Sequence, residues 1–253
     1  MRDWVSGQLH DRVWLALILS MAAGCWALPA QAQYYDGPAY SFPVMDMMGP
    51  AMAGTSMSSY INRQNPRRDD RDGTPPQPRA SLQVPRDRAL SQRVKAEFRA
   101  DLVRINPGKE VAIDQALAQD WLAGYRTDIA VPNGLDPANL ADAVTAYVIA
   151  GWAIVNRQEQ ISARGIARVR DNFRAAMAAS PQTAGLSAAA RQEMAERLIY
   201  QTVLIMANRV QIARTRDNQL AEAAARHYRE TLRSGTGIDL ANLKLEDSGF
   251  IAR

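Results

Sequence analysis

The side chains that most often carry chemistry in proteins are scarce in this sequence. It has two histidines and one cysteine, and His10 and Cys25 both fall within the first 32 residues. The remaining histidine, His227, stands beside Tyr228 in an amphipathic segment, where a lone histidine is more often a surface residue than a base or a ligand. The sequence also lacks a Gly-rich phosphate loop, a G-x-S-x-G elbow and an S-x-x-K motif. It therefore predicts no catalytic residue, no metal site and no cofactor.

A second set of candidates consists of polar side chains on or near two very apolar segments. These residues are Asp142, Asn156, Gln201, Thr202 and Asn208. They either line a ligand pocket between two helices or form interhelical hydrogen bonds that fix the register of the helices. Asp142 is either a buried acid or a first-turn carboxylate favoured by the helix dipole. All five are therefore candidate binding residues.

The first apolar segment predicts a central helix over residues 137–156. Asp136 followed by Pro137 is typical of a helix start, and apolar residues then recur on every side of the helix. The uninterrupted apolar part, Ala143 to Val155, is shorter than the roughly 20 residues that cross a bilayer. We therefore expect a buried core helix and not a membrane span.

The second apolar segment predicts a long helix over residues 188–216, which packs against the first. Amphipathic patterns predict further helices at about 90–102, 109–125, 161–179 and 217–233, the last one capped by Gly235. The tail after it has no clear period and is expected to be irregular. The fold class predicted is all-α, a single bundle of about five or six helices around the two buried apolar helices.

The N-terminal third has a different composition. Residues 1–32 have the features of a signal peptide: Arg2 and Arg12, an apolar run from Val13 to Ala23, and a small-x-small site that ends at Ala32. Cleavage near Ala32 predicts a periplasmic or secreted protein, and the alternative is a lipoprotein anchored at Cys25. Residues 33–84 are rich in Met, Gly, Pro and mixed charge, which predicts a disordered linker before a helical domain at 85–253.

The charge pattern bears on partners. The net charge of +4 is modest, and the basic residues are interleaved with acids instead of forming a patch. We therefore expect no nucleic-acid partner. Arg164, Arg168, Arg170 and Arg174 are interpreted as the solvated face of their helix.

Three stretches carry a resemblance to a known family. They are NLADAVTAYVIAGWAIVN at Asn139–Asn156, ERLIYQTVLIMAN at Glu196–Asn208 and LKLEDSGF at Leu243–Phe250. Over about residues 85–253 the chain resembles a family of uncharacterised exported bacterial proteins, known as a domain of unknown function. The resemblance implies export and a helical fold, and it implies no activity.

Two classes of function remain open after these observations. The first is an exported, non-catalytic helical module that binds a protein or a component of the cell envelope, with the N-terminal segment as a tether. The second is a carboxylate-based hydrolase that acts on a cell-wall polymer, because paired acids can do such work without His or Cys. A lipid-anchored envelope protein is a third interpretation.

Overall fold

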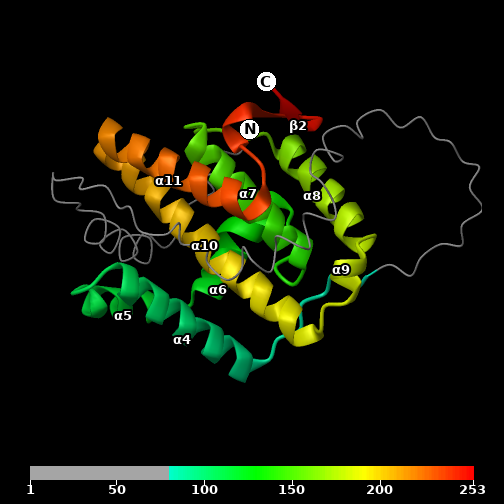
Figure 1. Ribbon diagram of the computed structural model, residues 1–253, viewed down its shortest axis with the longest axis horizontal. Helices are drawn as coiled ribbons and strands as arrows, with labels where there is room; N and C mark the ends of the chain where they lie inside the picture. Colours follow the sequence, from blue (N-terminus) through cyan, green and yellow to red (C-terminus); the bar gives the residue numbers. More distant parts are fainter. Residues whose placement is uncertain (1–79) are drawn as a thin grey trace, which may run out of the picture.

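The computed structural model describes residues 80–253, so the predicted signal peptide, Cys25 and most of the predicted linker lie outside the described residues. Helix α7 (Leu140–Val155) lies at the centre, and α8 (Ala163–Ala178), α10 (Ala188–Thr215) and α11 (Asn218–Thr236) pack around it (Figure 1). Every residue from Leu140 to Ile154 is buried. Six α-helices of the described part have eight or more residues, so the all-α prediction is confirmed.

The start of α7 differs from the sequence prediction. The cap is Asn139 and not Asp136, because the Asn139 side chain accepts hydrogen bonds from the backbone N–H groups of Ala141 and Asp142 at 3.0 and 3.4 Å. Residues before it form a turn, in which the carboxylate of Asp136 accepts from the N–H of Ala138 at 2.8 Å. The Asp-Pro pair therefore initiates this turn, and the helix begins three residues later.

Close backbone approach holds α7 against α11. A Cβ atom placed on Gly151 would lie 2.3 Å from Cδ1 of Leu232, so glycine allows the two helices to approach. On another side of α7, the indole N–H of Trp152 donates to the carbonyl of Leu243 at 3.0 Å. Helix α7 thus contacts both the last helix and the C-terminal segment directly.

The predicted helix at 109–125 is divided into shorter elements. They are α5 (Glu110–Leu117), α6 (Trp121–Gly124), the π-helical segment η1 (Tyr125–Ala130) and the 3₁₀ turn η2 (Val131–Asn133). The break occurs where Asp120 caps α6 by accepting from the N–H of Ala123 at 3.0 Å. The sequence did not predict this break, because apolar residues recur with helical spacing on both sides of it. Before α5 comes α4 (Arg88–Ile105), capped by Asp87.

Short elements complete the helical part. A four-residue helix, α9 (Pro181–Ala184), connects α8 to α10, and serine side chains cap α8, α9 and α10. Helix α11 ends at Thr236, and Gly237, with φ of 71°, adopts the left-handed conformation of its C-cap. The prediction of Gly235 as the cap was therefore wrong by two residues.

The C-terminal tail is ordered, which corrects the expectation of an irregular tail. The 3₁₀ turn η3 (Leu240–Asn242) leads into strands β1 (Leu243–Glu246) and β2 (Gly249–Ala252), which pair antiparallel with Leu245 opposite Phe250. The hairpin lies against α8 (Figure 1). Phe250 is buried, with its ring edge-on to Trp152 at 5.9 Å between centroids. Strands of four residues are too short to leave a clear alternation in the sequence.

Residues 80–84, which the sequence assigns to the linker, run extended along the helical body. The N–H of Ala80 donates to the carbonyl of Ala178 at 2.8 Å, and the N–H of Val84 donates to the carbonyl of Ala138 at 2.8 Å. Between them, the carbonyl of Leu82 accepts from the N–H of Leu140 at 2.9 Å. Among residues 80–253, no helix has the length and apolar character needed to cross a membrane.

Candidate functional site: polar contacts of α7 and α10

Asp142, the first candidate, is fully buried and paired. Its carboxylate accepts two hydrogen bonds from the guanidinium of Arg174 on α8, at 2.6 and 2.5 Å, and a third from the backbone N–H of Asp136 at 2.6 Å. The hydrogen bonds to Asp142 raise the pKa of Arg174 above its usual value. Arg174, which the sequence placed on a solvated face, thus supplies the charge that allows Asp142 to be buried.

Tyr125 of η1 is also buried, and its hydroxyl has no hydrogen-bond partner. Burial, followed by the negative charges of Asp142 and Asp136, raises the pKa of its phenol. The phenol therefore stays protonated at neutral pH, and Tyr125 contributes its ring to the core and no charge to this site.

Asn156, at the C-terminal end of α7, connects three segments. Its Nδ2 donates to the carbonyls of Trp152 and Leu240, both at 3.0 Å, and its Oδ1 accepts from the guanidinium of Arg253 at 2.7 Å. The side chain thereby ties the end of α7 to η3 and to the C-terminal residue. Asn156 and Asp142 are 14 residues apart, which is about 21 Å along a helix.

The three candidates on α10 make different contacts. Asn208 donates to the hydroxyl of Tyr228 on α11 at 2.7 Å, which is an interhelical bond. Thr202 donates to the carbonyl of Leu198 in its own helix at 2.8 Å. Gln201 is buried and its Oε1 has no partner. The contacts of Asp142, Asn156 and Asn208 join different pairs of elements, so these three residues do not meet in one site.

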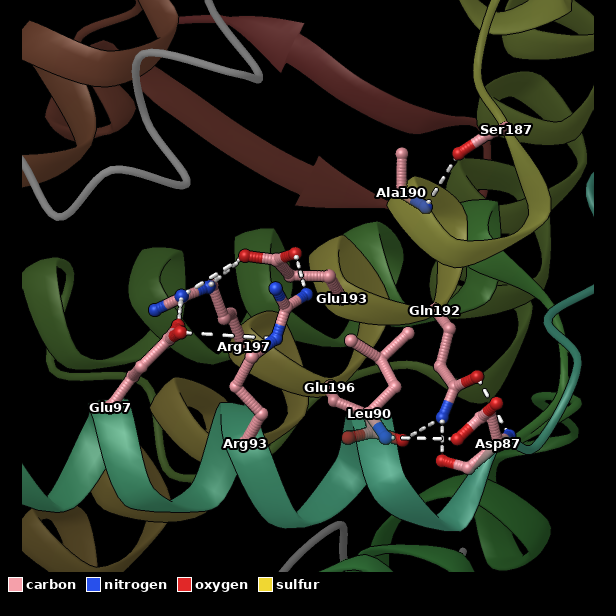
Figure 2. Close-up of polar contacts among 10 residues, drawn as sticks. All are labelled: Asp87, Leu90, Arg93, Glu97, Ser187, Ala190, Gln192, Glu193, Glu196 and Arg197. Atoms are coloured by element: carbon pink, nitrogen blue, oxygen red, sulfur yellow. Dashed lines mark hydrogen bonds and ion pairs between the residues drawn. The ribbon is translucent and has the colours of Figure 1, made fainter.

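Sequence reasoning missed a group of polar contacts between α4 and the first half of α10, the α4–α10 seam (Figure 2). At its centre Gln192 is fully buried. Its side chain pairs with the backbone of Asp87, accepting from the N–H and donating to the carbonyl, each at 2.8 Å. Its Nε2 also lies 3.0 Å from the hydroxyl of Ser91 and 2.9 Å from Oε1 of Glu196. Glu196 Oε1 accepts a further hydrogen bond from Ser91 at 2.6 Å.

The seam continues as an ion-pair network. Glu193 accepts from Arg93 of α4 at 3.0 Å and from Arg197 of its own helix at 3.1 Å. Arg197 also pairs with Glu97 of α4, and Figure 2 shows it between the two carboxylates. Only 9% of the Arg197 side chain is exposed, whereas 57% of the Arg93 side chain is exposed, so the network runs from the interior to the surface.

Aromatic rings pack where α4, α6 and α10 meet. Phe98 of α4 stacks on Tyr200 of α10 with 4.9 Å between ring centroids, and Trp121 of α6 lies 6.1 and 6.0 Å from these two rings. Burial raises the pKa of the Tyr200 phenol, and the negative charges of Glu196 and Asp120 raise it further. Glu196 is 5% exposed, and its second carboxylate oxygen, Oε2, has no hydrogen-bond partner.

His227 lies on the exposed side of α11, with its ring 5.1 Å from that of Tyr228. Among residues 80–253, no group of three or more His, Cys, Asp or Glu side chains is arranged to hold a metal ion.

Comparison with known proteins identifies a family and little more. The model of a family of unknown function, DUF6683, matches residues 10–253. The chain belongs to this family. The sequence-based resemblance is thus confirmed, and the DUF6683 match begins well before residue 85. No curated protein and no solved structure matches the chain.

One signal in this DUF6683 sequence could have revealed the α4–α10 seam. Gln192, Glu193, Glu196 and Arg197 are spaced so that they lie on one face of α10, directly before its apolar middle. Polar residues at such positions are usually interpreted as a solvated face. Here a second helix covers them, and only the tertiary structure identifies that helix as α4.

Proposed function

We propose that this chain is an exported, non-catalytic helical module that binds a protein or another component of the cell envelope. The observation that supports the proposal is that most of the candidate polar side chains in the core bond to other parts of the fold. The carboxylate of Asp142 is fully engaged by Arg174 and a backbone N–H, and Asn156 and Asn208 bond to neighbouring elements. These groups act as connections within the fold, which leaves recognition to the surface.

The features of a signal peptide in residues 1–32 support export. We propose a periplasmic or secreted location after cleavage near Ala32. Mass spectrometry of the mature N-terminus tests this location. An unmodified chain that begins at Gln33 is the expected result, and a lipid-modified Cys25 would indicate an anchored protein instead.

Cosedimentation tests the binding function. The mature chain is mixed with membrane vesicles and, separately, with peptidoglycan sacculi from the bacterium that produces it. We expect saturable retention by one fraction, with no soluble wall fragments released from the sacculi. Release of wall fragments would support the carboxylate-based hydrolase instead. Absence of retention by either fraction would overturn envelope binding.

A further inference from the structure

Met206 of α10 is the one methionine of residues 80–253 that is partly exposed. Its side chain packs against the hydrophobic core, whereas Met177 and Met194 are 7% and 1% exposed. Oxidation of a methionine converts its apolar thioether into a polar sulfoxide, which is disruptive inside a core. The groups beside the sulfur therefore decide what oxidation does to the fold.

A guanidinium lies directly beside the sulfur of Met206. Nη1 of Arg209, three residues further along α10, donates a hydrogen bond to Sδ of Met206 at 3.6 Å. Nη2 of the same guanidinium donates to the carbonyl of Gln158 at 2.5 Å, in the loop that follows α7. Because a thioether is a weak acceptor, the bond between Arg209 and the sulfur is the weaker of these two contacts.

The surroundings of Arg209 favour a stronger acceptor at this point. Burial lowers the pKa of its guanidinium to about 10, although the negative charge of Glu159 opposes this effect. The side chain therefore stays charged at neutral pH in surroundings that solvate its charge poorly. A strong acceptor added beside such a cation forms a charge-assisted hydrogen bond, which is roughly twice as strong as one between neutral groups.

We propose that Met206 is a site of oxidation by hydrogen peroxide, and that Arg209 binds the oxygen added to its sulfur. A sulfur lone pair attacks one oxygen of the peroxide, and the O–O bond breaks. The proton of the transferred hydroxyl passes to the departing oxygen, which leaves as water, and the sulfur keeps the other oxygen as a sulfoxide. Two electrons thus pass from the sulfur to the peroxide.

The fold accommodates the product because its new oxygen projects from a sulfur that Arg209 already contacts. Nη1 exchanges a weak acceptor for a strong one, and Nη2 keeps its bond to the carbonyl of Gln158, since the two nitrogens carry separate N–H donors. The link between α10 and the loop after α7 therefore persists in the oxidised protein. This inference is independent of the envelope-binding proposal, because it depends only on contacts within the helical body.

Peroxide treatment of the folded protein, followed by peptide mapping with mass spectrometry, tests the site. We expect Met206 to be oxidised at least about tenfold faster than Met177 and Met194, because buried sulfurs react only when the fold opens.

Urea unfolding before and after peroxide treatment tests the role of Arg209. The wild-type protein should keep or raise its midpoint after oxidation. In Arg209→Leu the same treatment should lower the midpoint, because the sulfoxide loses its guanidinium partner. The matched control is Met206→Leu, which forms no sulfoxide at this position and should show no shift. It retains the five methionines between Met45 and Met57, so any effect of their oxidation appears in this control as well.

The guanidinium signals of Arg209 in the ¹⁵N-labelled wild-type protein give a direct readout that needs no variant. They should move in proportion to the fraction of Met206 sulfoxide. The proposal is overturned if Met206 reacts no faster than Met177 and Met194, or if the Arg209 signals stay in place while the sulfoxide accumulates. It is also overturned if oxidation changes the urea midpoint equally in the wild-type protein and in Arg209→Leu.

Discussion

The surroundings of α7 and the α4–α10 seam bury polar groups in opposite ways. Helix α7 contains one charged residue, Asp142, whose carboxylate receives three hydrogen bonds, two of them from the guanidinium of Arg174, and the other residues of α7 are mostly apolar. At the seam, three charged side chains of α10 (Glu193, Glu196 and Arg197) and Gln192 contact α4, and one oxygen of Glu196 has no hydrogen-bond partner.

The two regions therefore contribute differently to the fold: the apolar burial of α7 mainly provides stability, and the polar contacts of the seam mainly determine where α4 lies. Apolar burial around α7 contributes stability that salt scarcely changes, whereas ion pairs near the surface contribute little and are screened by salt. The seam positions α4 through directional bonds. Three apolar residues of α4 are buried (Val94, Phe98 and Leu102), and three others pack against the core while partly exposed (Leu90, Val103 and Ile105). We therefore expect α7 to unfold with the whole domain and α4 to open more readily.

The largest effect is expected at Arg174. Arg174→Met leaves the carboxylate of Asp142 buried without its cation, which should lower the free energy of unfolding by about 3–5 kcal/mol. Chemical denaturation measures this loss. The matched control is Arg164→Met on the same helix, whose side chain is 86% exposed and should change stability by less than about 0.5 kcal/mol. Equal effects of the two substitutions would show that the Asp142–Arg174 pair does not stabilise the core.

Trp152→Ala should have an effect of similar size. The residue is 4% exposed, its ring contacts Phe250, and its indole N–H holds the carbonyl of Leu243. Removal of a buried aromatic side chain typically costs about 3–5 kcal/mol. Thermal unfolding checks the prediction, with Trp152→Phe as a control that retains most of the volume. A melting temperature equal to that of the unmodified protein would place Trp152 outside the core.

Gly151→Ala should be less costly because the clash involves a flexible side chain. The new methyl group would meet Cδ1 of Leu232, and displacement of this leucine should cost about 1–3 kcal/mol, partly offset by the higher helix propensity of alanine. The loss should shrink when Leu232→Ala is already present, a coupling that a double-mutant cycle measures. Strict additivity would mean that α7 and α11 do not touch at this position.

The smallest effect is expected in the ion-pair network. Glu193→Gln removes its pairs with Arg93 and Arg197, and the loss should be about 1 kcal/mol or less at low salt and smaller still at high salt. Unfolding in denaturing urea, which adds no ions, measures both values. A loss as large as that of Arg174→Met would erase the distinction between the two regions.

The sequence predicted the features that depend on the composition of one segment, and it did not predict contacts between residues that lie far apart in the chain. Helices α7 and α10 are apolar nearly all round in their middles, so their central position could be predicted. Asp142 and Arg174 are 32 residues apart, and Arg174 resembles its exposed neighbours, so their pairing could not. The seam joins residues about a hundred positions apart, such as Ser91 and Glu196. The four-residue strands and the break at Asp120 could not be predicted either, because they depend on local backbone geometry and not on the spacing of apolar residues.

Native-state hydrogen exchange of the amides in α7 and α4, at low and at high salt, tests this account most directly. We expect the α7 amides to exchange only through global unfolding, with little effect of salt. The α4 amides should exchange through a local opening of lower free energy, which salt lowers further by screening the pairs of Arg93, Arg197 and their glutamates. Equal protection of α4 and α7 at both salt concentrations would contradict the division of the fold into an apolar centre and a polar seam.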